Sequence, residues 1–176
     1  QLLQHPLAML LPRPPMERLL ERYASSYQNY YRLCLLRRLG LAPNPDEDSD
    51  DRLVSATLEL IASWPVGYGD FFAGLASVVQ SSGLPQEPEG LPVVLNNLPE
   101  PPREVWQNWR DAWWWQTQAI EPSGASELEA SVSEGLRRWN LSQTPTRPLI
   151  ESLWESIDQG DDWQPLGGWL ASVMTA

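Results

Sequence analysis

The chain has 176 residues, 42% of them hydrophobic, with ten tryptophans, a formal net charge of −11 and no lysine. This length and apolar content are enough for one domain with a buried core and argue against general disorder. The lack of lysine excludes a Schiff-base or phosphate-binding lysine from this segment, and the acidic charge argues against nucleic acid as a partner.

Apolar residues recur at steps of three and four, which predicts an all-α fold of about six to seven helices. The first helix is expected over 15–39, with Gly40 in the left-handed conformation that often follows a helix end. Its last turns carry Arg32, Arg37 and Arg38. We expect these arginines on the solvent side, where cations suit a helix C-terminus, and we favour this placement over a polyanion-binding site.

The acidic segment 42–51 predicts a loop that leads into a second helix, capped by Asp48 or Ser49. Asp46, Asp48 and Asp50 have the spacing of the first three EF-hand ligands. Aspartate replaces the turn glycine of that motif, however, and threonine replaces its bidentate glutamate. The sequence therefore predicts a solvated helix start without calcium.

The rest of the chain continues the helical pattern around one long proline-rich loop. A third helix is expected over 70–79, with Asp70 as its cap, and the loop over 81–102. Because "LPVVLNNL" within this loop is apolar, we expect the loop to wrap the surface of the protein. Further helices are expected over 103–115, 126–139, 149–160 and 162–170. The whole chain, 1–176, is predicted to form a single helical domain.

Motifs for nucleotide, metal, redox and hydrolase chemistry are absent from the sequence. Cys34 falls in an apolar register typical of a small core residue, and His5 lies close to the start of the chain. We therefore predict no catalytic, cofactor-binding or metal-binding residue. A single cysteine, with no membrane-length apolar stretch and no signal-peptide layout, favours a cytoplasmic protein without a membrane partner.

Three adjacent tryptophans, Trp113, Trp114 and Trp115, are the candidate partner surface. Exposed aromatic side chains can bind a peptide, a sugar or a single strand. The tryptophans are spread over five expected helices, however, and we expect most of them to fill the core or an interface with a partner. Consecutive positions point in different directions on a helix, so at least one of the three is expected at an edge.

The order of several short segments resembles the C-terminal helical region of the selenoprotein O (SelO, or YdiU-like) family of protein adenylyltransferases. These segments are "LAMLLP", "LLRRLGL", an acidic gap, "LVSATLELI" and "GYGDFFAGL". Leu39, Gly40 and Leu41 match a helix end of the family, with Arg38 in place of lysine. In the next motif the matches are Tyr68, Phe72 and Leu75, and the departures are Gly67, Gly69 and Ala73.

The resemblance continues into the second half of the chain. "WQNWRDAW" occupies the place of a tryptophan-containing helix of the family. Asn140 and the pair Gly160 and Asp161 have the separation of its "NPxxxLRN…GD" block. The departures are Leu141 for proline, and Arg147 with Pro148 for Arg-Asn one position along.

The resemblance implies a parent enzyme that transfers AMP from ATP to protein hydroxyls on a kinase-like fold with Mg²⁺. The nucleotide lysine, metal ligands and catalytic aspartate of the family lie upstream of the matched region, and its Cys-x-x-Cys redox motif is missing here. No functional residue is therefore carried over. We expect a non-catalytic C-terminal portion that packs on or regulates the kinase-like domain. The chain begins at Gln1 with the apolar segment 2–11, as we expect of an internal segment.

Two other interpretations remain open. The chain could be a free-standing acidic helical module that binds a protein partner through its tryptophan-rich surfaces and segment 2–11. A small independent enzyme would need an active site that the sequence does not show. An upstream kinase-like sequence in the same reading frame would distinguish the parent-enzyme interpretation from both.

Overall fold

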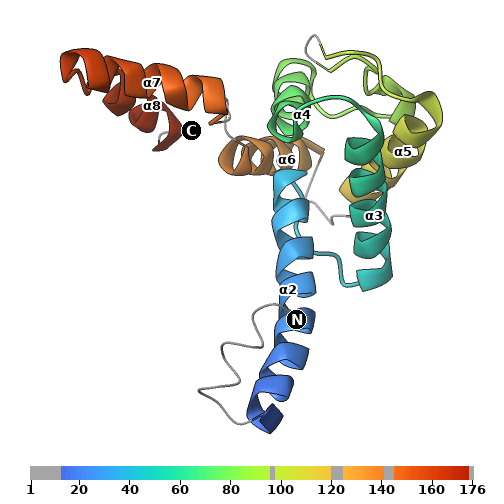
Figure 1. Ribbon diagram of the computed structural model, residues 1–176. Helices are drawn as coiled ribbons and strands as arrows, with labels where there is room; N and C mark the ends of the chain where they lie inside the picture. The colour runs from blue at the N-terminus through green and yellow to red at the C-terminus, as the bar shows by residue number, and fades with distance from the viewer. Residues whose placement is uncertain (1–12, 96–97, 120–124, 141–144, 175–176) are drawn as a thin grey trace.

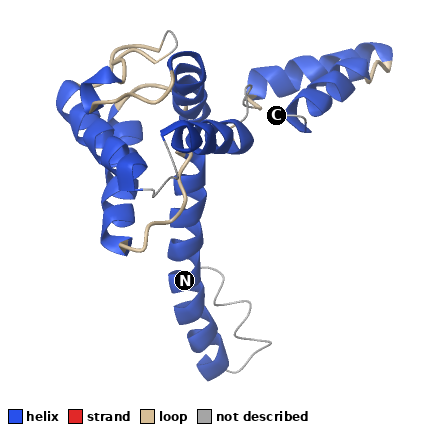
Figure 2. Ribbon diagram, turned by 180° about the vertical axis from the view of Figure 1, so that it is seen from behind, coloured by secondary structure: helices blue, strands red, loops and turns tan. Residues whose placement is uncertain are grey.

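Seven α-helices and one short 3-10 helix make up the regular structure of residues 13–95, 98–119, 125–140 and 145–174, which the computed structural model describes (Figure 1). These residues contain no strand (Figure 2), which confirms the predicted all-α class. The helices are α2 (Arg13–Arg38), α3 (Glu47–Ser63), α4 (Tyr68–Ser82), η1 (Pro88–Gly90), α5 (Arg103–Ala119), α6 (Ala125–Trp139), α7 (Arg147–Gly160) and α8 (Gln164–Met174).

The end of α2 is a Schellman motif centred on Gly40. The N–H of Leu41 donates to the carbonyl of Leu36 at 2.9 Å, and the N–H of Gly40 donates to that of Arg37 at 3.0 Å. Gly40 has φ 77°, and a Cβ there would lie 2.7 Å from the carbonyl oxygen of Val132 in α6. Both its conformation and the close crossing of α6 therefore require glycine, which confirms the predicted helix end.

The start of α3 differs from the prediction. Asp46 is the N-cap, without a side-chain cap hydrogen bond, and Asp48 and Ser49 lie inside the helix. The incoming loop is held by Asp50, whose carboxylate accepts the N–H of Asn44 at 3.1 Å. The predicted cap is wrong because several acidic residues in a row fit the helix start equally well, and tertiary contacts select which one turns inward.

The start of α4 also lies earlier than predicted. Gly67 is the N-cap, so Asp70 is a residue of the first turn and not the cap. A carboxylate in the first turn still interacts favourably with the positive end of the helix dipole. The predicted cap is therefore wrong because the helix begins two residues before Asp70.

The long loop after α4 is tied to the helices by two tryptophans. The indole Nε1 of Trp64 donates to the carbonyl of Pro99 at 3.0 Å, and that of Trp114 donates to the carbonyl of Pro85 at 3.1 Å. Its buried leucines are Leu91 and Leu95. The loop therefore packs on the helical core as the apolar "LPVVLNNL" segment predicts.

The core lies between α3 and α5, which run side by side, with α2, α4 and α6 around them (Figure 1). Trp106, Trp109 and Trp113 recur at helical spacing and fill this core from one face of α5. Trp109 Nε1 donates to the hydroxyl of Thr57 in α3 at 3.1 Å, and Trp113 Nε1 donates to the carbonyl of Leu39 at 3.1 Å. These indoles therefore join three helices.

Two elements extend away from this core in both views (Figures 1 and 2). The first part of α2 projects beyond the other helices, and α7 and α8 pack on each other as a hairpin to one side. None of the described helices combines the length and the hydropathy needed to cross a membrane.

Candidate functional site

The described residues contain no group of three or more His, Cys, Asp or Glu side chains that could hold a metal ion. Cys34 is a free thiol and only half-buried, so its contribution to the core is smaller than its register predicts. His5 lies outside the described residues. The remaining candidate sites of the described part are its buried charges and its exposed surfaces.

Asp50 is a buried carboxylate, only 1% exposed, between α3, the preceding loop and α5. The amide of Gln116 donates to it at 2.8 Å, and the side chain of Asn44 in turn donates to Gln116 at 2.9 Å. Burial raises the pKa of Asp50, while the hydrogen bonds from Asn44 and Gln116 and the charge of Arg32 oppose that rise. Because these donors belong to the chain itself, Asp50 joins structural elements and presents no free acid to a substrate.

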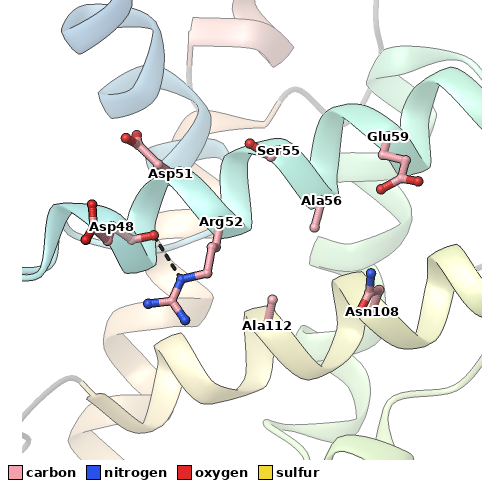
Figure 3. A pocket seen from close by; sticks show the side chains of 8 residues that line it. All are labelled: Asp48, Asp51, Arg52, Ser55, Ala56, Glu59, Asn108 and Ala112. Carbon is pink, nitrogen blue, oxygen red and sulfur yellow. Dashed lines mark hydrogen bonds between the residues drawn. The ribbon is translucent and has the colours of Figure 1, made fainter.

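An acidic groove lies between α3 and α5 (Figure 3). Its lining residues are Asp48, Asp51, Arg52, Ser55, Ala56, Glu59, Asn108 and Ala112. Arg52 donates to the backbone carbonyl of Asp48 at 3.2 Å along the rim. The carboxylates of the groove outnumber this one arginine, so the groove repels anions. Asp46 and Asp48, exposed at the helix start, do not converge with the buried Asp50 on a common ligand position.

The three adjacent tryptophans of the candidate partner surface have three different environments. Trp113 is fully buried, Trp114 is half-buried with its indole N–H bonded to the loop, and Trp115 is 67% exposed. Trp113 faces the core because it continues the spacing of Trp106 and Trp109. The three side chains therefore do not form one exposed platform, and the part of this surface open to a partner is centred on Trp115.

A much larger aromatic surface lies on the projecting part of α2. Tyr23, Tyr27 and Tyr31 stack in sequence, with ring centroids 5.9 and 6.1 Å apart. Tyr23 and Tyr30 are each 65% exposed, and Tyr27 is 54% exposed. The periodicity that predicts this helix therefore includes an apolar face on which Tyr23, Tyr27 and Tyr30 stay exposed while Tyr31, nearer the core, is half-buried. We call it the tyrosine face.

The hairpin of α7 and α8 carries a second uncovered surface. No residue of α7, whose 14 residues are all described, is buried. Its large exposed side chains, together with those of α8 and of the turn between the two helices, are Ile150, Trp154, Trp163 and Leu170. We call this surface the hairpin face. Large apolar side chains exposed on one short hairpin are typical of an interaction site.

The arginines at the end of α2 are not simply solvated, which corrects the prediction. Arg32 forms ion pairs with Glu47 at 3.2 Å and Asp51 at 3.5 Å, and its side chain is 15% exposed. Hydrogen bonding to Glu47 raises the pKa of Arg32. This arginine therefore fastens α2 to the start of α3.

Arg37 and Arg38 stack on aromatic rings from other helices. The guanidinium of Arg37 lies 4.9 Å from the ring centroid of Trp139, and that of Arg38 lies 4.6 Å from Tyr68 and 4.2 Å from Phe72. A helical pattern places an arginine on a face but does not reveal which ring from a distant segment will cover it. The spacing of Arg37 and Arg38 relative to Leu36 and Leu39 was the available signal, because it places them at the edge of the buried stripe.

The helices and their exposed surfaces define an all-α module, and comparison of its sequence with known proteins relates this module to protein nucleotidyltransferases. The family model described as Protein adenylyltransferase SelO matches residues 1–174. The Protein nucleotidyltransferase YdiU of Trichodesmium erythraeum is 32% identical over 94% of this chain and 32% of its own length. That of Gloeobacter violaceus is 34% identical over 93% of this chain and 32% of its own length.

The chain therefore belongs to the SelO family, which confirms the resemblance of its motifs. It spans about one third of the length of the curated relatives it matches. No solved structure matches the chain significantly.

Proposed function

We propose that this chain is the non-catalytic, C-terminal helical portion of a SelO-type protein adenylyltransferase and that it packs on, or regulates, the kinase-like domain. The single observation that carries the proposal is the uncovered apolar surface on two separate elements, the tyrosine face and the hairpin face. The match to about one third of the length of the relatives supports an intramolecular partner for these faces.

The size of these faces makes docking energetically reasonable. Full burial of one large apolar side chain stabilises a protein by roughly 1.5–3 kcal/mol. The exposed members of the two faces, such as Tyr23 and Trp154, would each contribute part of that on docking. Their combined burial gives several kcal/mol, which offsets the entropy cost of docking, and that cost is smaller when the partner is a domain of the same chain.

In this proposal the parent enzyme transfers AMP from ATP to serine, threonine or tyrosine hydroxyls of proteins, with Mg²⁺, and works in the cytoplasm. The residues that bind ATP and Mg²⁺ belong to the kinase-like domain, and this chain supplies none of them. Its contribution is to support that domain or to set its conformation.

A free-standing acidic interaction module is the second candidate, and the exposed Trp115 and Trp139, which lie outside the tyrosine and hairpin faces, favour it. The intact mass of the native gene product in cell extract separates the two candidates. A product large enough to add a kinase-like domain supports the proposal, and a product of about the chain's own 19.9 kDa replaces it with the module.

Charge insertion on the hairpin face of the full-length protein tests the docking itself. Trp154→Asp places a carboxylate on the apolar face, whereas Ser152→Asp adds the same charge to another exposed position of α7. We expect Trp154→Asp to increase protease cleavage around the hairpin and to change AMP transfer by the whole enzyme, while Ser152→Asp leaves both unchanged. Equal behaviour of the two variants would contradict docking through this face.

A further inference from the structure

The C-terminal ends of α2 and α6 meet at one exposed tryptophan. Arg37, in the last turn of α2, lies 4.9 Å from the ring centroid of Trp139, and Arg138, in the last turn of α6, lies 5.8 Å from the same centroid. Trp139 remains 44% exposed. Two positive charges are therefore held around one indole at the surface.

Arg38 adds a third guanidinium in a fixed orientation. Its Nε donates to Asn140 Oδ1 at 3.1 Å, and Asn140 Nδ2 donates back to the carbonyl of Arg38 at 2.8 Å. Tyr68 and Phe72 stack on its guanidinium. The contacts among the described residues leave its two terminal nitrogens without an acceptor. A stacked guanidinium keeps its in-plane N–H groups for a carboxylate, with less entropy to lose on binding.

What distinguishes this place is that three arginines without an ion pair gather around neighbouring aromatic rings, whereas Arg18, Arg22 and Arg103, which also form no described ion pair, have no such ring contacts. The arginines that pair with carboxylates elsewhere in the described part are Arg32, Arg52, Arg110, Arg137 and Arg147. Arg37, Arg38 and Arg138 form no ion pair with any described acidic residue. The two helix C-termini supply about half a negative charge each, and Glu134, which pairs with Arg137, also attracts Arg138. These negative charges offset the three guanidinium groups only in part, so the place keeps a positive charge.

We propose that Arg37, Arg38 and Arg138, which we call the arginine patch, bind an acidic segment of another protein. The guanidinium groups would bind aspartate or glutamate carboxylates, and the exposed Trp139 and Tyr68 would contact the intervening peptide. A long polyphosphate such as nucleic acid is disfavoured because it would extend beyond the patch over a chain with a net charge of −11, whereas a short acidic segment can stay within the patch. This surface is distinct from the tyrosine and hairpin faces, and the proposal does not depend on their docking.

Fluorescence anisotropy of the full-length protein with a labelled peptide of alternating glutamate and serine tests the arginine patch. A glutamine version of the same peptide is the uncharged probe. The double variant Arg37→Glu/Arg138→Glu reverses the two charges beside Trp139 but keeps the hydrogen bonds between Arg38 and Asn140. Arg103→Glu, at an exposed position of α5 without a described ion pair, is the matched charge reversal. A circular dichroism melt checks that each variant folds.

We expect the glutamate peptide to bind the unaltered protein and the Arg103→Glu variant alike. Binding should weaken by at least about tenfold in the double variant and should fall with added salt. Arg38→Lys should also weaken it, because lysine keeps the charge but loses the planar donors. The proposal is overturned if the glutamine peptide binds equally well, if the folded double variant keeps full affinity, or if no peptide binds. It is also overturned if inorganic phosphate binds the protein and the glutamate peptide does not.

Discussion

Replacing Trp113 with phenylalanine tests whether the buried indoles stabilise this domain by hydrogen bonding as well as by volume. Trp113 and Trp106 are both buried on the same face of α5. The indole N–H of Trp113 donates to the carbonyl of Leu39, whereas that of Trp106 has no partner among the described residues. The same substitution at both positions therefore removes a similar volume but only one hydrogen bond.

The expected difference follows from the group that is left behind. The residue Leu39 is fully buried, so without the indole its carbonyl would remain unsatisfied in the core. Leaving one buried polar group unsatisfied costs about 1–3 kcal/mol. Trp106→Phe breaks no hydrogen bond among the described residues, because the indole N–H that it removes has no acceptor there. We therefore expect Trp113→Phe to lower the free energy of unfolding by about 1–3 kcal/mol more than Trp106→Phe does.

Trp109→Phe provides an intermediate case. Its indole donates to the hydroxyl of Thr57, which also donates to the carbonyl of Leu53 and so keeps one bond. The expected cost beyond volume is about 1 kcal/mol. Denaturant unfolding of the three variants, followed by far-ultraviolet circular dichroism, gives the order directly. If Trp113→Phe and Trp106→Phe agree within about 0.5 kcal/mol, the hydrogen-bond argument is refuted.

Two further predictions concern backbone strain and pH. Gly40→Val should destabilise the chain by at least about 2 kcal/mol in thermal unfolding, because it combines positive φ with a collision at Val132. Gly167→Ala is the control, because a Cβ there meets no atom within 4 Å, and it should leave stability unchanged or raise it by up to about 1 kcal/mol. An unchanged melting temperature for Gly40→Val would place the helix end elsewhere. Burial raises the folded-state pKa of Asp50, so the protonated carboxyl contributes to the stability of the fold. This contribution is fully present below the ordinary pKa of the group and is lost as pH rises through the raised value. Asp50→Asn should therefore gain stability relative to the unaltered chain across that pH interval. The free energy of unfolding of both proteins is measured from about pH 3 to about pH 7, with about one measurement per pH unit, and a difference that does not change with pH would contradict the raised pKa of Asp50.

The spacing of residues along the chain determined the helices of this protein. Apolar side chains at steps of three and four identify a helix and its buried face, because both depend on geometry within about two turns. The stop at Gly40 and the common face of Trp106, Trp109 and Trp113 follow from such local rules. The order of short motifs likewise revealed the family, since homologous chains keep their elements in sequence.

Tertiary structure alone decided which of these faces are covered. The tyrosine face of α2 has the same periodicity as the core face of α5, yet Tyr23 is 65% exposed and Trp113 is buried. Local spacing specifies that a face is apolar, but burial depends on which distant helix packs there. The same reason explains the arginine patch. Arg38 stacks on Tyr68 and Phe72 and bonds Asn140, 102 positions away, and such contacts exist only once α2, α4 and α6 have come together.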